Sequence, residues 1–238
     1  MKAASHALML DEHDDASPVD VACDGAERGR SIYFELTGAN AAEARVDTDH
    51  DFDRHVLASI IAVSAMNEGD ICQRVGLSPE EFIPLLDHWF PRAQVLPAVL
   101  VEPTVPEDDE LVMVRDLLLA NRSTDEDIAR WLAHMVARRA MEPSHLWEDL
   151  GLRSREELSR MLERHFAPLA GRNTRGMRWK RFFYRMLCED EGFVMCTTPV
   201  CTDCCDFDNC FGAEDGEGRL ARRRLEPSLA LAQAEAQQ

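Results

Sequence analysis

The sequence lacks the patterns that would place the protein in a membrane or in a familiar enzyme class. No window among its 238 residues approaches the roughly 18 apolar residues of a membrane-spanning helix. The N-terminus turns acidic before a long apolar run develops, so we expect no secretory signal. A glycine-rich phosphate loop, an HExxH motif and a nucleophile elbow are missing, and we expect His88, His134 and His165 to pack or cap helices. These absences predict a cytoplasmic protein without a membrane partner.

Positive charge is also scarce. The chain holds 26 Lys and Arg against 44 Asp and Glu, which gives a formal net charge of −18. A chain this acidic is repelled by DNA and by anionic lipid, because both attract clustered Lys and Arg. The sequence therefore predicts no nucleic-acid partner.

About half of the net charge lies in residues 1–53, which hold thirteen acidic and four basic side chains. Glycine, alanine and serine are scattered through this segment, and its apolar residues follow no sustained period. Such a segment buries too little apolar surface to offset the entropy that ordering costs. We therefore expect 1–53 to be an acidic, disordered tail.

Helical patterns dominate residues 54–187, and no stretch has the pattern of a parallel sheet. Two stretches in this region match each other at an offset of 76 residues. The matching pairs are Ser78 and Ser154, Glu81 and Glu157, and Phe90 and Phe166. A serine followed three residues later by a glutamate is the capping box that starts a helix. We expect an all-α domain that contains two weakly related helical hairpins.

The last predicted helix, MRWKRFFYRMLCEDEGF (177–193), has an apolar, aromatic face and a basic one. Arg178, Arg181 and Arg185 fall on one stripe because of their i, i+3, i+7 spacing. This stripe is either an ordinary solvated face or the approach to a site for an oxyanion such as molybdate.

Cysteines are concentrated directly after this helix. Five of the eight lie in the stretch CTTPVCTDCCDFDNC, and four of these follow the spacing C-x4-C-x2-C-x5-C. Cys205 lies beside the pattern, and Cys188 lies eight residues before it. In a reducing cytoplasm such a group indicates a metal site more than a disulfide framework. We assign 188–218 to a cysteine-rich cluster-binding loop and 219–238 to a tail rich in Arg, Ala and Gln.

Three interpretations of this loop stay open on spacing alone. Zinc sites usually join two short knuckles across a longer spacer, and here only Cys201-x2-Cys204 forms such a knuckle. Iron–sulfur clusters use compact runs with gaps of this kind, so the spacing favours them. Unliganded thiols are disfavoured, because five of them in a polar loop would invite oxidation. Because the loop is polar, we expect it to hold a cluster that is transferred to another protein rather than a buried structural cluster.

The run RWKRFFYRMLCEDEGFVMC, followed by the cysteine pattern and FG, resembles the NifQ family of nitrogenase iron–molybdenum cofactor assembly. The resemblance covers 55–212 and is strongest over 145–212. It implies a molybdenum–iron–sulfur cluster, formed from an iron–sulfur precursor and molybdate. It also implies that the cluster is a molybdenum source for the cofactor scaffold protein and the nitrogenase iron protein. The ligands implied by position are Cys196, Cys201, Cys204 and Cys210.

On this resemblance we expect a carrier of a 4Fe-4S or Mo-3Fe-4S type cluster rather than a turnover enzyme. The alternative is a zinc- or iron–sulfur-containing DNA-binding protein. An iron–sulfur DNA glycosylase has a longer first gap, C-x6-C-x2-C-x5-C, than the gap in this chain. A helix-turn-helix regulator would place its second helix in the stretch ICQRVGLSPEEFIPLL (71–86), but that helix is acidic and contains Pro84.

Overall fold

The protein is known from a computed structural model that describes residues 18–67, 69–93 and 108–190. These residues form ten α-helices and one short 3₁₀ helix, and none of them lies in a β-strand. The expected all-α class is therefore confirmed for the described part of the chain. The helices are α1 (Pro18–Thr37), η1 (Ala41–Glu43), α2 (Asp49–Ser64), α3 (Ile71–Val75), α4 (Pro79–Trp89), α5 (Asp109–Ala120), α6 (Asp127–Ala140), α7 (Leu146–Asp149), α8 (Arg155–His165), α9 (Ala167–Ala170) and α10 (Trp179–Asp190).

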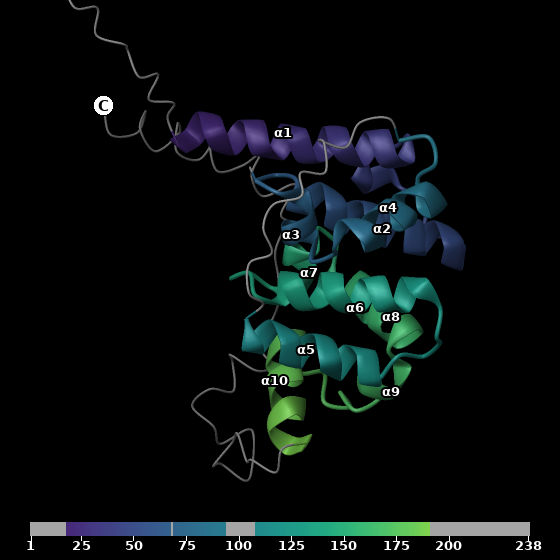
Figure 1. Ribbon diagram of the computed structural model, residues 1–238, viewed down its shortest axis with the longest axis vertical. Helices are drawn as coiled ribbons and strands as arrows, with labels where there is room; N and C mark the ends of the chain where they lie inside the picture. The colour runs from purple at the N-terminus through teal and green to yellow at the C-terminus, as the bar shows by residue number, and fades with distance from the viewer. Residues whose placement is uncertain (1–17, 68, 94–107, 191–238) are drawn as a thin grey trace, which may run out of the picture.

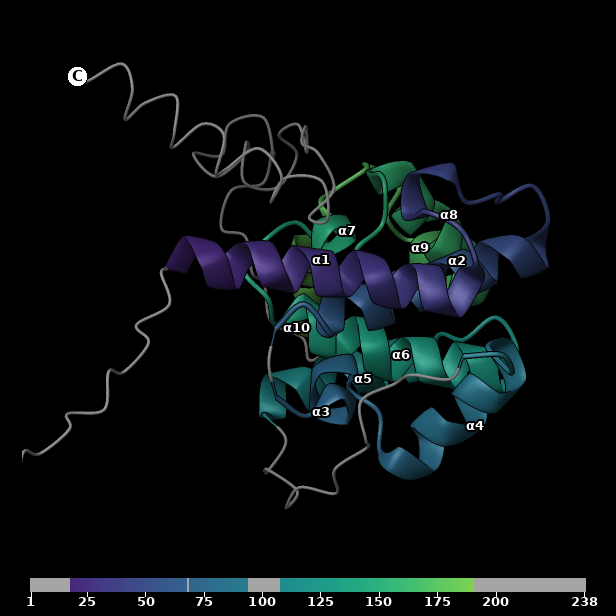
Figure 2. The same cartoon turned by 90° about the horizontal axis from the view of Figure 1, so that it is seen from above.

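The helices form a stack with α1 at one end and α10 at the other (Figure 1). Helix α1 packs along α2, and α5 packs along α6. The buried apolar side chains form one continuous core, which reaches from Tyr33 on α1 through Phe52 on α2 to Phe183 on α10. Seen from above, α1 crosses over the body, and α4 lies at its outer edge (Figure 2). No helix in the described ranges is long and apolar enough to cross a membrane.

The two stretches that match at an offset of 76 residues fold in the same way. Each has a short helix (α3 or α7), a glycine turn and an eleven-residue helix (α4 or α8). Gly76 and Gly151 both adopt the left-handed conformation, with φ of 84° and 71°. Phe90 and Phe166 end the longer helices with similar backbone angles, φ −134° and ψ 51° in the first and φ −138° and ψ 44° in the second. A local repeat of helix, turn and helix therefore underlies the sequence match.

Each glycine turn packs against the long helix of the other half of the chain, where the first half is α1–α4 and the second is α5–α8. A Cβ atom on Gly76 would lie 2.9 Å from the carbonyl oxygen of His134 on α6. A Cβ atom on Gly151 would lie 2.7 Å from the carbonyl oxygen of Ser59 on α2. The two glycines are 75 residues apart, and so are the two residues that they approach, Ser59 and His134. The two halves are therefore interlocked by reciprocal contacts and form one body.

Residues 26–53, which fall in the segment that we expected to be a disordered tail, are instead part of this body. Tyr33 and Leu36 on α1 are buried in the core. Arg54 Nη2 donates a hydrogen bond to the Leu36 carbonyl oxygen at 2.7 Å, which fastens the end of α1 to α2. The apolar residues of α1 are interrupted by acidic residues and glycines, so the average composition concealed a helix with one buried face. Residues 1–17 lie outside the described residues.

We predict that Gly151→Ala lowers the free energy of unfolding by about 2–4 kcal/mol, because the new methyl group meets the Ser59 backbone and φ is positive. Gly38→Ala is the matched control, since Gly38 has a φ of 77° but no atom within 4 Å of an added Cβ. The control should cost only about 1–2 kcal/mol. Urea unfolding measures both values, and equal losses would show that the close approach of the turn is unimportant.

Candidate metal-cluster region

The expected metal site lies outside the described residues. Its cysteines are Cys196, Cys201, Cys204 and Cys210, with Cys205 beside them. Cys188 is described, and its free, partly buried thiol lies in the last turn of α10. Burial raises the pKa of the Cys72 thiol to about 11, which identifies Cys72 as a core residue and not a thiolate ligand. Within 18–67, 69–93 and 108–190, no three His, Cys, Asp or Glu side chains are grouped so that they could hold a metal ion.

Helix α10, which leads to the cysteine loop, is held to the body by an aromatic face. Its buried side chains are Trp179, Phe182, Phe183 and Met186, and their i, i+3, i+4, i+7 spacing places them on one side. The Trp179 indole nitrogen donates a hydrogen bond to Ser159 Oγ on α8 at 3.3 Å. Tight packing therefore fixes the orientation of α10 and the direction of its basic face.

A buried ion pair adds a second constraint on α10. The Lys180 amine lies 2.6 Å from Asp149 Oδ2 at the end of α7, and it also donates to the Glu142 carbonyl oxygen. The Asp149 side chain has no exposed surface. Burial lowers the pKa of Lys180, and Asp149 partly offsets this effect. Lys180, which our sequence analysis counted only as part of a basic run, is therefore a structural residue that ties α10 to the α6–α7 connection.

A third contact joins α10 to the first turn of α5. The Tyr184 hydroxyl donates a hydrogen bond to the Glu110 carboxylate. Burial and the nearby Glu110 charge both raise the pKa of Tyr184, so the hydroxyl keeps its proton. The start of α5 is itself fixed, because its N-cap residue Asp108 accepts a hydrogen bond from the Glu110 N–H at 2.9 Å. Helix α10 is thus attached to elements from across the second half of the chain.

The arginine stripe is only partly available as a basic surface. Arg181 is exposed on α10, whereas Arg185 forms an ion pair with Glu189, with an Nε–Oε1 distance of 2.7 Å. Arg178 precedes the helix, and its carbonyl oxygen accepts a hydrogen bond from the Phe182 N–H at 2.9 Å. We missed the compensation of Arg185, although the i, i+4 spacing of an arginine and a glutamate is typical of a helical ion pair. Arg181 is therefore the best placed of the three to meet an external anion.

Further arginines lie in a loop directly before α10, residues 171–178, which we call the arginine loop. Asn173 closes this loop, since its Oδ1 accepts from the Met177 N–H at 2.8 Å and its Nδ2 donates to the Met177 carbonyl oxygen at 2.9 Å. The side chains of Arg172 and Arg175 are exposed. The loop therefore extends the basic surface of α10 on a backbone of defined shape.

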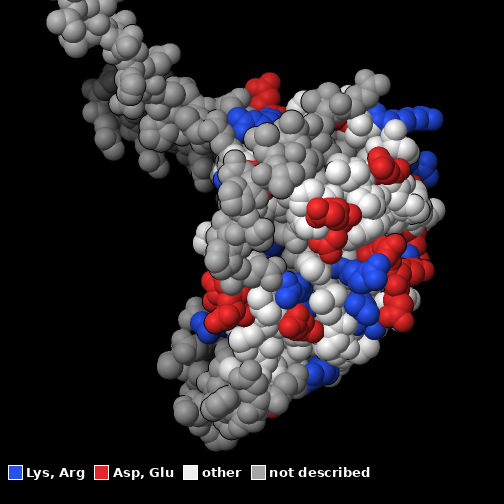
Figure 3. All heavy atoms as spheres, in the orientation of Figure 1, with Lys and Arg blue, Asp and Glu red and all other residues white. Residues whose placement is uncertain are grey.

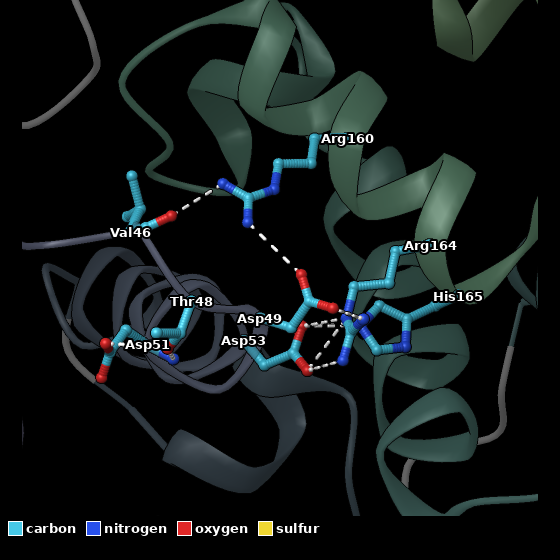
Figure 4. A network of polar contacts seen from close by, with 8 residues as sticks. All are labelled: Val46, Thr48, Asp49, Asp51, Asp53, Arg160, Arg164 and His165. Atoms are coloured by element: carbon cyan, nitrogen blue, oxygen red, sulfur yellow. Dashed lines mark hydrogen bonds and ion pairs between the residues drawn. The ribbon is translucent and has the colours of Figure 1, made fainter.

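A polar network joins α2 to α8 (Figure 4). Buried Asp53 on α2 accepts hydrogen bonds from Arg164 Nε at 3.0 Å and from His165 Nε2 at 2.8 Å. Burial alone would raise the pKa of Asp53, but the hydrogen bonds from His165 and Arg164 outweigh it and lower the pKa. At the edge of the network, Asp49 pairs with both Arg160 and Arg164. The charges in this network neutralise one another, so its role is to hold α2 and α8 together. His165 is buried in the network, which agrees with its expected structural role.

A second buried network connects α1, α2 and the start of α8. The Tyr33 hydroxyl lies 2.6 Å from Nδ1 of His55, and Nε2 of the same ring lies 3.2 Å from Glu157 Oε2. Glu157 also accepts a hydrogen bond from Arg153 Nε at 2.6 Å. Burial would raise the pKa of Glu157, but the hydrogen bonds from His55 and Arg153 outweigh it and lower the pKa to about 2. Glu157 therefore stays ionised and joins the two halves of the chain.

Comparison with known proteins shows which family contains α10 and the cysteine-rich segment after it. The family model NifQ matches residues 56–212, which include α10 and the five clustered cysteines. This chain belongs to the NifQ family. The matched range begins within α2, so α1 and residues 213–238 lie outside the NifQ match.

Curated NifQ proteins are similar to the chain over most of its length. The "Protein NifQ homolog" of Sinorhizobium fredii is 39% identical over 176 residues, which are 72% of this chain and 76% of that protein. "Protein NifQ" of Rhodobacter capsulatus is 41% identical over 160 residues, 67% of this chain and 87% of its own. "Protein NifQ" of Azotobacter vinelandii is 36% identical over 193 residues, 74% of this chain and 98% of its own. No solved structure matches the chain.

We predict that Lys180→Met lowers the free energy of unfolding by about 3–4 kcal/mol, because it removes the cation that pairs with the buried Asp149 carboxylate at 2.6 Å. Arg181→Met is the matched control, since the neighbouring side chain is exposed and its loss should change stability by less than about 0.5 kcal/mol. The double variant Lys180→Met with Asp149→Asn should recover part of the loss. Urea unfolding measures all three, and a loss in Lys180→Met no larger than in the control would contradict the assignment.

We predict that Glu157 makes the fold sensitive to acid. Its pKa in the folded protein is lower than its ordinary value of 4.5, so the ionised carboxylate stabilises the fold above that pH. This contribution, about 2–3 kcal/mol, is lost as the pH falls from 4.5 toward about 2. Glu157→Gln should lower stability at neutral pH and flatten the acid dependence in urea unfolding, while Glu163→Gln on the exposed side of α8 should change neither. A variant with the acid profile of the unmodified protein would disprove this role.

Proposed function

We propose that this NifQ-family chain carries an iron–sulfur cluster into which molybdenum is built. The chain then supplies molybdenum for biosynthesis of the nitrogenase iron–molybdenum cofactor. The observation that carries this proposal is the NifQ match over 56–212, which contains the whole C-x4-C-x2-C-x5-C pattern. Family membership implies a role in nitrogen fixation and in nitrogenase cofactor biosynthesis. In this proposal the cluster is cargo, and the chain is a carrier rather than a turnover enzyme.

The chemistry of the donor set suits such cargo. Thiolates are soft ligands that bind iron, and four of them within fifteen residues can surround a cluster of the 4Fe-4S or Mo-3Fe-4S type. The proposed ligands are Cys196, Cys201, Cys204 and Cys210. Cys205 and Cys188 are additional thiols outside the spacing. A cytoplasmic location would keep all of these thiols reduced.

The described part of the chain supports an electrostatic route for molybdate. Molybdate is a dianion at neutral pH, and a chain with a net charge of −18 repels it at long range. The proposed approach residues are Arg178, Arg181 and Arg185, with Arg181 contributing most because Arg185 is paired with Glu189. Seven residues, or about two helical turns, separate Arg181 from Cys188, so both lie on the same side of α10. Arginine at this place would raise the local concentration of an oxyanion near the start of the cysteine loop.

The proposed recipients of the cargo are the cofactor scaffold protein and the nitrogenase iron protein. The alternative of a DNA-binding protein gains no support from α3 and α4, although these helices do form a helix-turn-helix. The exposed side of α4 presents Glu80 and Asp87, which would repel DNA phosphates.

We predict that protein isolated without oxygen is brown and contains iron and molybdenum by elemental analysis. Alanine at Cys196, Cys201, Cys204 or Cys210 should remove at least half of the iron, because each variant loses a thiolate ligand, whereas Cys188→Ala should retain it. Equal iron loss in Cys205→Ala would reassign the ligand from Cys204 to its neighbour. A colourless protein that holds one zinc ion, even after anaerobic treatment with iron and sulfide, would defeat the proposed function.

We predict that Arg181→Gln lowers molybdenum incorporation severalfold and leaves iron content unchanged, because it removes positive potential without removing a ligand. The triple variant with Arg178→Gln and Arg185→Gln should show a larger defect. Added salt should reduce incorporation by the unmodified protein toward the level of the variants. Arg130→Gln, at an exposed site on α6, is the control. A parallel fall of iron and molybdenum would make the stripe structural, and no fall of either would make it a solvated face.

A further inference from the structure

The two matching helices of the repeat, α4 and α8, differ in what contacts their outer faces. The outer face of α4 is exposed, whereas other helices contact the same positions of α8. In the described ranges three large hydrophobic side chains are exposed, namely Phe34 on α1, Ile83 on α4 and Met113 on α5. Ile83 is 49% exposed, and Pro84 beside it is also exposed. The face that we call the α4 face consists of these two residues with Glu80 and Asp87, one turn away on either side.

The equivalent residues of α8 are in contact with other parts of the chain. Because α4 and α8 match residue for residue at an offset of 76, Ile83 corresponds to Ser159 and Pro84 to Arg160. Ser159 lies under α10, where the Trp179 indole donates to its hydroxyl. The Arg160 guanidinium lies 4.0 Å from the centroid of the Phe52 ring on α2. The α8 face is thus partly covered, although the Arg160 side chain is still 39% exposed, and Trp179 comes from a helix that has no counterpart among the described residues of the first half.

The difference is visible in the burial of the two helices. Helix α8 buries Leu158, Met161, Leu162 and His165. Helix α4 buries Phe82 and Leu85, and it leaves Leu86 and Trp89 only partly covered, at the positions equivalent to Leu162 and His165. Helix α4 also lies at the outer edge of the molecule, where a partner can reach it (Figure 2).

We propose that the α4 face docks an amphipathic helix from a partner protein, one with an apolar centre and basic residues beside it. The helical form follows from α10, whose first residue, Trp179, contacts the equivalent residue of α8, Ser159. The basic flank follows from charge complementarity, since Glu80 and Asp87 border the apolar centre. Around α4, the surface is largely uncharged, with acidic groups and some basic groups beside it (Figure 3).

A second copy of this chain fits the α4 face poorly. Two α4 faces meeting around a two-fold axis would bring the Glu80 and Asp87 carboxylates of one copy against those of the other. Like charges at such a contact oppose association. The docking surface is also short, because eleven residues of helix span about 16 Å. A basic helix of about three turns therefore matches it in both length and charge, and the contact is suited to transient binding.

The test uses a peptide of α10 itself, because α10 has the required chemistry and contacts Ser159 at the equivalent position of α8. The probe is residues 177–190 with Cys188→Ser, titrated into the full-length, isotope-labelled protein while amide NMR signals are followed. We expect the signals of α4 to shift, and Ile83→Asp to weaken binding at least tenfold. Phe34→Asp is the matched control at another exposed apolar side chain, and it should bind within twofold of the unmodified protein.

Each other outcome would overturn the proposal. Shifts centred on α5 and α8 would mean that the peptide displaces the protein's own α10. Unchanged binding by a peptide whose four basic residues are replaced with glutamate would remove the charge argument. Equal losses in Phe34→Asp and Ile83→Asp, or no shifts at millimolar peptide, would show that the α4 face has no special role. A dimer that sedimentation detects and that Ile83→Asp dissociates would make the occupant a second copy. The proposal rests on the repeat and not on the proposed cargo, so these outcomes leave the metal analysis unaffected.

Discussion

The close approach of two glycine turns to the long helices α2 and α6 is the constraint on which the rest of the fold depends. At Gly76 and at Gly151 a side chain would collide with the backbone of the opposite half. Each turn sets the position of the eleven-residue helix that follows it, so α4 is placed against α6 and α8 against α2. Because each half supplies part of the surface that the other half packs on, the described halves form a single domain and not two separately folded units joined by a linker.

This interlocking explains why the ionisable residues inside the fold are paired. Asp53 meets Arg164 and His165 across the junction of the two halves, and Glu157 meets His55 across the junction and Arg153 within its own half. A buried histidine beside a carboxylate has the appearance of a catalytic or metal-binding pair. In both networks, however, the carboxylate is already paired with arginine as well, so the low pKa reflects a stable ion pair rather than a group poised for proton transfer.

The same body supports the approach to the cysteine loop. Helix α10 is attached by an aromatic face, by the pair Lys180–Asp149 and by the contact Tyr184–Glu110, so its basic side has a defined direction. A rigid local patch of arginine matters in a chain with a net charge of −18, since only short-range potential can oppose the long-range repulsion of an oxyanion. The α4 face, by contrast, is bordered by the negatively charged Glu80 and Asp87. The basic side of α10 and the acidic border of the α4 face are therefore suited to different binding partners.

Local features of the sequence determined the all-α class, the start of α4 at its capping box and the membership of the NifQ family, whereas the capping box expected at Ser154 does not form. Helical period, caps and the spacing of cysteines depend only on neighbouring residues, so they could be predicted before the fold was known. The tertiary structure decided what depends on distant ones. It placed α1 in the core, paired Lys180 with a carboxylate 31 residues away and joined His55 to Glu157 across 102 residues. It also left Ile83 exposed where its counterpart Ser159 contacts Trp179 of α10, because such a contact depends on which helix packs there, and no local pattern specifies that.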